Sequence, residues 1–267
     1  MRYRNIEFLT GKSRKFDADL YRVIEILDKG ILTAVDRAEL IRIYQSSYHD
    51  DGKIEGITSC DSSCNGCGFC QNMLEAASKD ITIICGFCYD EAQERYKIHA
   101  RNRHSLNLLI MMTVEFTEEE LKRIPMTDLG RVNSSGETPN VTYARNMIKV
   151  VYANPYTDFG YWAKNTSPVI QAIDELGKPD NLKLIQSSIH IGKPAKLAKH
   201  FDYTFTVYPD EATTEAAIRN GSSPCNGMKC KSCGFKCYKG THTGTDIAEL
   251  LRTSKAKRKV ILEAMSF

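Results

Sequence analysis

The sequence predicts an α/β protein with a parallel sheet, arranged as a partial (βα) barrel of five or six units. Strand-like and helix-like segments alternate through the second half of the chain, at an interval that favours right-handed crossovers. Five or six such units are too few to close an eight-stranded barrel. N-terminal helices and a C-terminal cysteine-rich loop are predicted to flank the barrel. We expect functional groups at the carboxyl ends of the strands.

The first half of the chain is predicted to be mainly helical. Residues 17–49 have apolar residues at helical spacing, with a stop at Gly30. Residues 89–109 resemble a long amphipathic helix, and Thr117 with Glu120 forms a capping box. Further along, the predicted strands are 53–59, 129–135, 157–164, 182–191 and 202–209, and the predicted helices are 139–153, 167–177, 193–201 and 211–221.

Composition and segment pattern give the expected organisation. We expect an N-terminal helical segment at 1–52, a partial barrel with the first cysteine block at 53–221, and a cluster loop with a C-terminal helix at 222–267. The chain has 267 residues, of which 42% are hydrophobic, so it can bury a core without covalent staples. No apolar leader or long apolar run occurs, which predicts a cytoplasmic protein without membrane contact. The net charge of +3 is a weak argument for a nucleic-acid partner.

The cysteines carry the strongest chemical signal. All ten lie in two short blocks. Closely spaced thiols in a reducing compartment are typical metal ligands, whereas disulfide frameworks belong mostly to small secreted domains. The predicted metal ligands are Cys60, Cys64, Cys67, Cys70, Cys85 and Cys88 in the first block, and Cys225, Cys230, Cys233 and Cys237 in the second.

Three metal chemistries fit these spacings. The matched pairs Cys67-Gly-Phe-Cys70 and Cys85-Gly-Phe-Cys88 are typical of a four-thiolate zinc site. The second block has the irregular spacing of ferredoxin-type iron–sulfur loops. Cys60-x3-Cys64-x2-Cys67 resembles the three-ligand pattern of radical S-adenosylmethionine enzymes, without the aromatic residue common before its last cysteine.

The turn after the predicted strand 129–135 is a second candidate. Gly136-Glu137 resembles the Gly-Gly-Glu-Pro turn of radical S-adenosylmethionine enzymes, which implies a carboxylate that binds the amino group of the cofactor. The same residues also fit an ordinary turn between a strand and a helix. Arg131 and Lys164 are predicted to point toward the same end of the sheet, either to hold a carboxylate or phosphate or to pair with Glu137 or Asp158.

Two histidines are further candidate site residues. His190 follows a predicted strand, and His242 lies five residues after Cys237. A lone histidine is more often a hydrogen-bonded structural residue than a ligand.

Across about residues 53–240 the chain resembles the phage and plasmid gene-product-eighty-eight-like family, which itself looks like a reduced radical S-adenosylmethionine barrel. The resemblance departs at Glu137, where that group tends to have Asp, and in the extra cysteines of the first block. The residues that carry it are Cys85 to Tyr89 with Gln93, Arg95 and Tyr96, then 131–137, 160–164, Ser187, Ser188 and the terminal cysteine block.

The resemblance implies an iron–sulfur protein with redox or radical chemistry. One [4Fe–4S] cluster is expected on Cys85, Cys88 and one or two upstream cysteines, and another on the second block; ten thiols could also divide into three centres. Gly136, Glu137, Arg131, Lys164 and Ser188 are the implied cofactor-binding residues, with S-adenosylmethionine as cofactor and an electron-donor protein as partner. The alternative is a non-catalytic zinc or iron–sulfur module that contacts a protein or nucleic acid.

Overall fold

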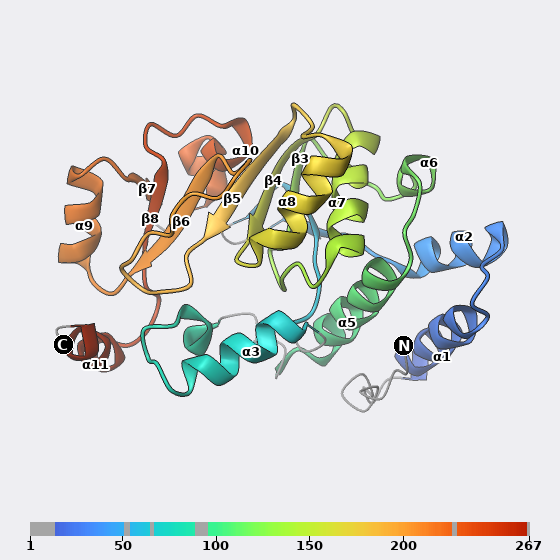
Figure 1. Cartoon of the computed structure of the whole chain (residues 1–267), viewed down its shortest axis with the longest axis horizontal. Coiled ribbons are helices and arrows are strands. Elements are labelled where there is room, and N and C mark those ends of the chain that lie inside the picture. Colours follow the sequence, from blue (N-terminus) through green and yellow to red (C-terminus); the bar gives the residue numbers. More distant parts are fainter. Residues whose placement is uncertain (1–13, 51–53, 65–66, 89–95, 226–228, 266–267) are drawn as a thin grey trace.

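The computed structural model describes residues 14–50, 54–64, 67–88, 96–225 and 229–265 (Figure 1). Its helices are α1 (Arg14–Asp28), α2 (Ala34–Ile43), α3 (Gly68–Ala77), α5 (Ile98–Thr113), α6 (Glu118–Leu121), α7 (Val141–Ala153), α8 (Thr166–Leu176), α9 (Glu211–Arg219), α10 (Lys236–Lys239) and α11 (Lys255–Met265), with the short 3-10 helices η2 (Ile84–Phe87) and η3 (Cys230–Cys233). Its strands are β1 (Ser47–His49), β2 (Ile57–Cys60), β3 (Leu129–Val132), β4 (Asp158–Ala163), β5 (Leu182–Ser187), β6 (Tyr203–Tyr208), β7 (Ser223–Cys225) and β8 (Asp246–Leu250).

The strands form one open sheet in the order β1-β2-β3-β4-β5-β6-β8-β7. All neighbours pair in parallel except β1, which runs antiparallel to β2 at one edge. The predicted α/β class and mostly parallel sheet are confirmed. The predicted barrel is not, because the sheet is not closed, and it has eight strands rather than five or six.

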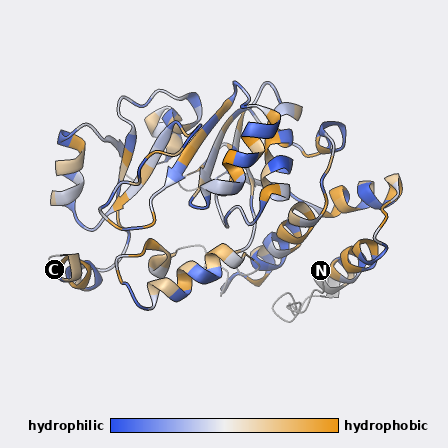
Figure 2. Cartoon of the chain, in the orientation of Figure 1, coloured by the Kyte–Doolittle hydropathy of each residue, from blue (hydrophilic) through white to orange (hydrophobic). Residues whose placement is uncertain are grey.

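One face of the sheet carries the main apolar core. Val132, Phe159 and Tyr161 point from the strands into a buried cluster that also contains Met147 of α7 and Val169 of α8. In Figure 1, α7 and α8 lie side by side over this part of the sheet, and both bear hydrophobic and hydrophilic stripes in Figure 2. Since each helix buries only one stripe, the pattern is that of helices packed on a sheet.

The other face carries a smaller core beneath the second cysteine block. Ile57, Leu129, Trp162 and Ile185 lie there with Tyr238 of α10. The helix α10 contacts β4 and β5. The segment between β7 and β8 therefore packs over strands from the middle of the sequence.

Most predicted segments correspond to an element of the right type. The predicted strands match β2, β3, β4, β5 and β6, and the helices before residue 178 match α1, α2, α5, α7 and α8. The capping box is present, since the Thr117 hydroxyl accepts from the Glu120 N–H while the Glu120 carboxylate accepts from the Thr117 N–H. Residues 89–95 of the predicted helix 89–109 lie outside the described residues.

The predicted helix at 193–201 is wrong. Two side chains at the end of β5 capture its backbone donors: the Ala195 N–H donates to Ser188 Oγ at 2.9 Å, and the Ala198 N–H donates to Gln186 Oε1 at 2.8 Å. The segment is therefore irregular rather than helical, because donors bonded to side chains are lost to a helix.

Among the described residues, no helix is both long enough and apolar enough to cross a bilayer.

Candidate functional site

Five cysteines of the first block gather beside the ends of β2, β3 and β4. We call Cys64, Cys67, Cys70, Cys85 and Cys88 the first cysteine group. Cys64, Cys67 and Cys70 form a buried cluster against which Phe69 and Cys88 pack. The helix α3 and η2 contact each other, which brings Cys85 and Cys88 to the same place. A pocket there is lined by Cys64, Phe69, Cys70, Leu74, Cys85, Cys88, Gly136, Glu137 and Lys164.

The thiols of this group interact with one another. Cys70 is hydrogen-bonded to both Cys64 and Cys67. The bond from Cys70 lowers the pKa of Cys67, although burial acts in the other direction. Cys67 occupies the N-cap position of α3 without a side-chain capping bond, and Cys70 lies in the first turn of the helix. A helix N-terminus favours the thiolate form, which binds metals, and the pKa of Cys67 is lowered accordingly. The bond to Cys64 acts to lower the pKa of Cys70, but its bond to Cys67 and its burial outweigh that effect and raise the pKa instead.

A buried carboxylate lines the same pocket. Glu137 is 3% exposed, and its two oxygens accept from the backbone N–H groups of Thr138 and Lys164, each at 2.8 Å. Burial raises the pKa of Glu137, and the Lys164 ammonium acts to lower it. Partial burial acts to lower the pKa of Lys164, but the charges of Glu137, Cys85 and Cys88 outweigh it and raise that pKa. The pocket thus combines thiols, one carboxylate and one cation.

The turn that presents Glu137 is fastened to the cysteine loop. The Ser62 N–H donates to the Ser135 carbonyl at 3.1 Å. From the loop side, Asp61 Oδ1 accepts from the N–H groups of Ser134 at 2.9 Å and Ser135 at 3.0 Å. Burial acts to raise the pKa of Asp61, but the His49 imidazole 3.9 Å away, the nearby His104 and the hydrogen bonds from Ser134 hold it below its usual value. Asp61 was missed at the sequence level, although an acidic residue directly after a buried strand was a usable signal.

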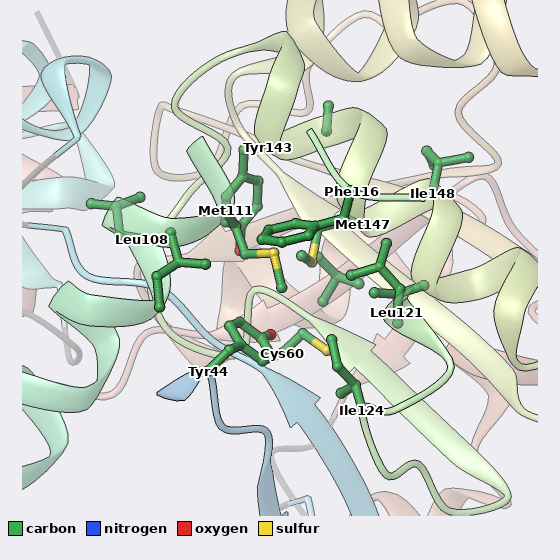
Figure 3. Close-up of a cluster of buried hydrophobic side chains, with 14 of the residues drawn as sticks. Tyr44, Cys60, Leu108, Met111, Phe116, Leu121, Ile124, Tyr143, Met147 and Ile148 are labelled. Atoms are coloured by element: carbon green, nitrogen blue, oxygen red, sulfur yellow. The ribbon is translucent and has the colours of Figure 1, made fainter. Parts of the chain in front are cut away.

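Cys60 is in a different place from the first cysteine group. It is fully buried in the main apolar core, beside Tyr44 and near Met111 and Tyr143 (Figure 3). Burial raises the pKa of its thiol to about 12. Cys60 is thus in another cluster than Cys64 and Cys67, with which it forms the Cys-x3-Cys-x2-Cys spacing, because it is the last residue of β2 and its side chain points into the core face.

The second block forms a separate site, which we call the second cysteine group: Cys225, Cys230, Cys233 and Cys237. β7 ends at Cys225, η3 spans Cys230 to Cys233, and α10 carries Cys237. Burial and the neighbouring Cys225 and Cys230 raise the pKa of Cys237 to about 12. His242 Nε2 lies 3.2 Å from Cys237 Sγ, and burial with the nearby Lys236 lowers the pKa of His242 to about 4.

Arg131 lies at the second cysteine group and not with Lys164. Its guanidinium stacks 4.0 Å from the centroid of the Trp162 ring, and its charge acts on Cys237 and Tyr238. Lys164 instead follows the end of β4 and faces the first group. The expectation that these two cations share one site is not met, because Arg131 is in mid-strand on the α10 face whereas Lys164 lies beyond the strand.

With this geometry in view, the chain can be compared with known proteins. The profile of the family described as "Gene product 88" matches residues 32–261. The chain belongs to the Gene product 88 family. The match extends beyond the 53–240 range that carried the resemblance, so it includes α2 and most of α11. No curated protein and no solved structure matches the chain.

Two of the remaining candidate residues in this Gene product 88 family member, Ser188 and His190, make contacts that support the fold. Ser188 is buried, and its hydroxyl bonds to Thr206 Oγ1 at 2.9 Å in addition to Ala195. His190 forms an isolated bridge with Ile83 that ties the segment before η2 to the loop after β5. Tyr96 is 86% exposed, and Tyr89, Gln93 and Arg95 lie outside the described residues.

Within the ranges that the structure describes, no three His, Cys, Asp or Glu side chains are arranged to hold one metal ion.

Proposed function

We propose that this chain is an iron–sulfur protein with redox or radical chemistry at the first cysteine group. The observation that carries the proposal is the pocket in which Cys64, Cys70, Cys85 and Cys88 face Glu137 and Lys164. Thiols are the usual ligands of such clusters. Each iron of a [4Fe–4S] cluster takes a separate ligand, so the thiols need not converge on one ion as they do for zinc.

The first cysteine group would hold the reactive cluster, and the second would hold an accessory one. A cluster with one iron left open would supply the electron for reductive cleavage of S-adenosylmethionine. Glu137 is suited to accept from an amino group, and the Lys164 ammonium is suited to a carboxylate. Cys60 is left out of the proposed ligands because it lies in the apolar core.

Anaerobic purification with iron, sulfide and zinc analysis and an optical spectrum tests the proposal. Brown protein with iron and sulfide supports it, and colourless protein that holds only zinc contradicts it. Binding of S-adenosylmethionine is then measured by calorimetry on the brown protein, and cleavage by product analysis after reduction. Failure of both limits the function to redox chemistry.

A zinc-binding module is the second candidate. The contact of 3.2 Å between His242 Nε2 and Cys237 Sγ places an imidazole among thiols, a combination typical of structural zinc sites. In that case the second group would organise a contact with a protein or nucleic acid. Zinc that stays with the chain after removal of iron distinguishes this candidate from the first.

A further inference from the structure

Each cysteine group has a cation supplied by the sheet. Lys164, directly after β4, acts on Cys85, Cys88 and Cys70. Arg131, within the neighbouring strand β3, acts on Cys237. Lys164 follows one strand and Arg131 lies within the neighbouring strand, yet the two side chains lie at different cysteine groups.

We propose that the fixed charge of Arg131 acts on the second cysteine group. This charge stabilises the anionic, metal-loaded form of the group and raises the reduction potential of the bound centre. The inference rests on the proposed function, because it assigns a metal centre to that group. Four thiolates give a bound centre net negative charge, and a nearby cation favours the more negative, reduced state.

The surroundings of Arg131 hold its guanidinium in place. In the sheet register Arg131 is opposite Gly160, and Trp162 is two residues further along β4 on the same face. A Cβ at Gly160 would lie 2.5 Å from the Trp162 ring and 3.3 Å from Tyr238. The missing side chain therefore makes room for the indole on which Arg131 stacks, and Tyr238 packs on that indole at 5.6 Å between ring centroids.

The lysines of the same loop are differently placed. Lys231, Lys236 and Lys239 are exposed, so water and salt screen their charges. Arg131 is partly buried, and a guanidinium stays charged at every accessible pH. One interior cation should therefore affect the bound centre more than an exposed lysine next to Cys237.

The test uses the full chain with Cys64→Ser, Cys67→Ser, Cys70→Ser, Cys85→Ser and Cys88→Ser, so that the first cysteine group has no thiol left to hold a cluster. The protein is reconstituted anaerobically with iron and sulfide, and its midpoint potential is measured by redox titration followed by electron paramagnetic resonance. In this background Arg131→Met should lower the reduced-to-oxidised ratio at fixed potential about tenfold, a shift of about 59 mV for one electron. Lys236→Met is the matched exposed control and should shift the ratio less than twofold.

Arg131→Lys separates charge from packing, because it keeps the charge and loses the planar stack. The midpoint potential of Arg131→Lys should stay close to that of the parent. Lys164→Met, made separately in the parent, should leave the midpoint potential unchanged. A shift in Arg131→Lys as large as in Arg131→Met overturns the inference, as does an equal shift in Lys164→Met or no shift in Arg131→Met.

A second measurement separates this inference from the proposed function. If the second group takes no iron, the proposed accessory cluster fails, and metal-free protein is titrated with Co2+ and followed by its visible absorption. Arg131→Met should then weaken Co2+ binding about tenfold, with Lys236→Met near the parent value. Equal affinity for Co2+ in the parent and in Arg131→Met overturns the role of Arg131 itself.

Discussion

The α-carbon of Gly136 lies against the backbone of Ser62. A Cβ at Gly136 would stand 2.2 Å from both the carbonyl oxygen and the hydroxyl oxygen of Ser62, and Gly136 has φ of +85°. Two requirements for glycine thus meet at one residue, a left-handed backbone and a close approach of two chains. The contact joins the loop before the first cysteine group to the turn that presents Glu137.

Gly136→Ala should separate the two loops and destabilise the first cysteine group. The backbone strain alone costs about 1 to 3 kcal/mol, and the clash with Ser62 adds to it. Urea unfolding should show the loss of stability, and metal analysis should show lower occupancy of the first group. Gly56→Ala is the matched control, since Gly56 has φ of +80° and nothing within 4 Å of a Cβ. Equal losses in the two variants would mean that the Ser62 contact has no part in the effect.

Cys60 and Cys85 should respond oppositely to alanine. Cys60→Ala leaves a small void in the core and should cost about 1 kcal/mol of unfolding free energy, with the metal content unchanged. Cys85→Ala removes a partly exposed thiol of the pocket and should lower the iron content with a smaller effect on the metal-free fold. Iron per chain and the urea midpoint of the metal-free protein are the two measurements. Loss of iron in Cys60→Ala would return that residue to the ligand set.

The ion pair between Arg37 and Glu120 should make stability depend on acid pH. The hydrogen bond from Arg37 lowers the pKa of Glu120 from 4.5 to about 2. A carboxyl whose pKa is lower in the folded state stabilises the fold above its unfolded pKa and loses that contribution as pH falls. The contribution is at most about 3 kcal/mol and should disappear between about pH 4.5 and pH 2.

Glu120→Gln should therefore flatten the decline in unfolding free energy between pH 7 and pH 3, measured by urea unfolding. Glu118→Gln is the matched control, since Glu118 is exposed on the same short helix. An equally steep decline in Glu120→Gln and the parent would contradict the role of the pair.

Gly160→Ala should disturb the second cysteine group through Trp162. The added methyl would overlap the indole, whose rigid ring cannot move without displacing Tyr238. Trp162 is the sole tryptophan of the chain, so a red shift of the intrinsic fluorescence reports the change directly. Gly68→Ala, where a Cβ meets nothing within 4 Å, should leave the spectrum unchanged. An unshifted spectrum in Gly160→Ala would show that the pocket has room for the methyl group.

The sequence pattern predicted the central strands because their apolar residues are continuous and turn residues bound them. It missed β7, β8 and α3. β8 is short and contains Glu249, whereas β7 ends at the first cysteine of one block and α3 starts inside the other, and both blocks were interpreted only as ligands. It was also wrong at β1, which lies within the segment 17–49 predicted to be helical. The helix at 193–201 failed because Ser188 and Gln186 compete for its backbone donors, and such contacts are not encoded within the segment itself.

The candidate site, too, was predictable from the sequence only in part. Spacing placed the cysteines in two groups, but it could not show that Cys60 points into the opposite face from Arg131. In β3 and β2 these two residues are one register position apart, and successive side chains of a strand point to opposite faces. The contacts of each face then depend on elements that lie far along the chain, such as α10, which packs on β4 and β5.

The two cysteine groups also differ in the length of chain that must fold before their cysteines come together. The second spans only residues 225 to 237, so a nascent or partly folded chain can already present its thiols to a metal. The first is complete only after the loop behind β2, the turn behind β3 and the end of β4 have come together from residues 64 to 164. Contacts so distant in sequence form late in folding. If both groups bind metal as proposed, this topology predicts an order of loading, in which the second group binds its metal first and the first group does so only once the sheet has formed.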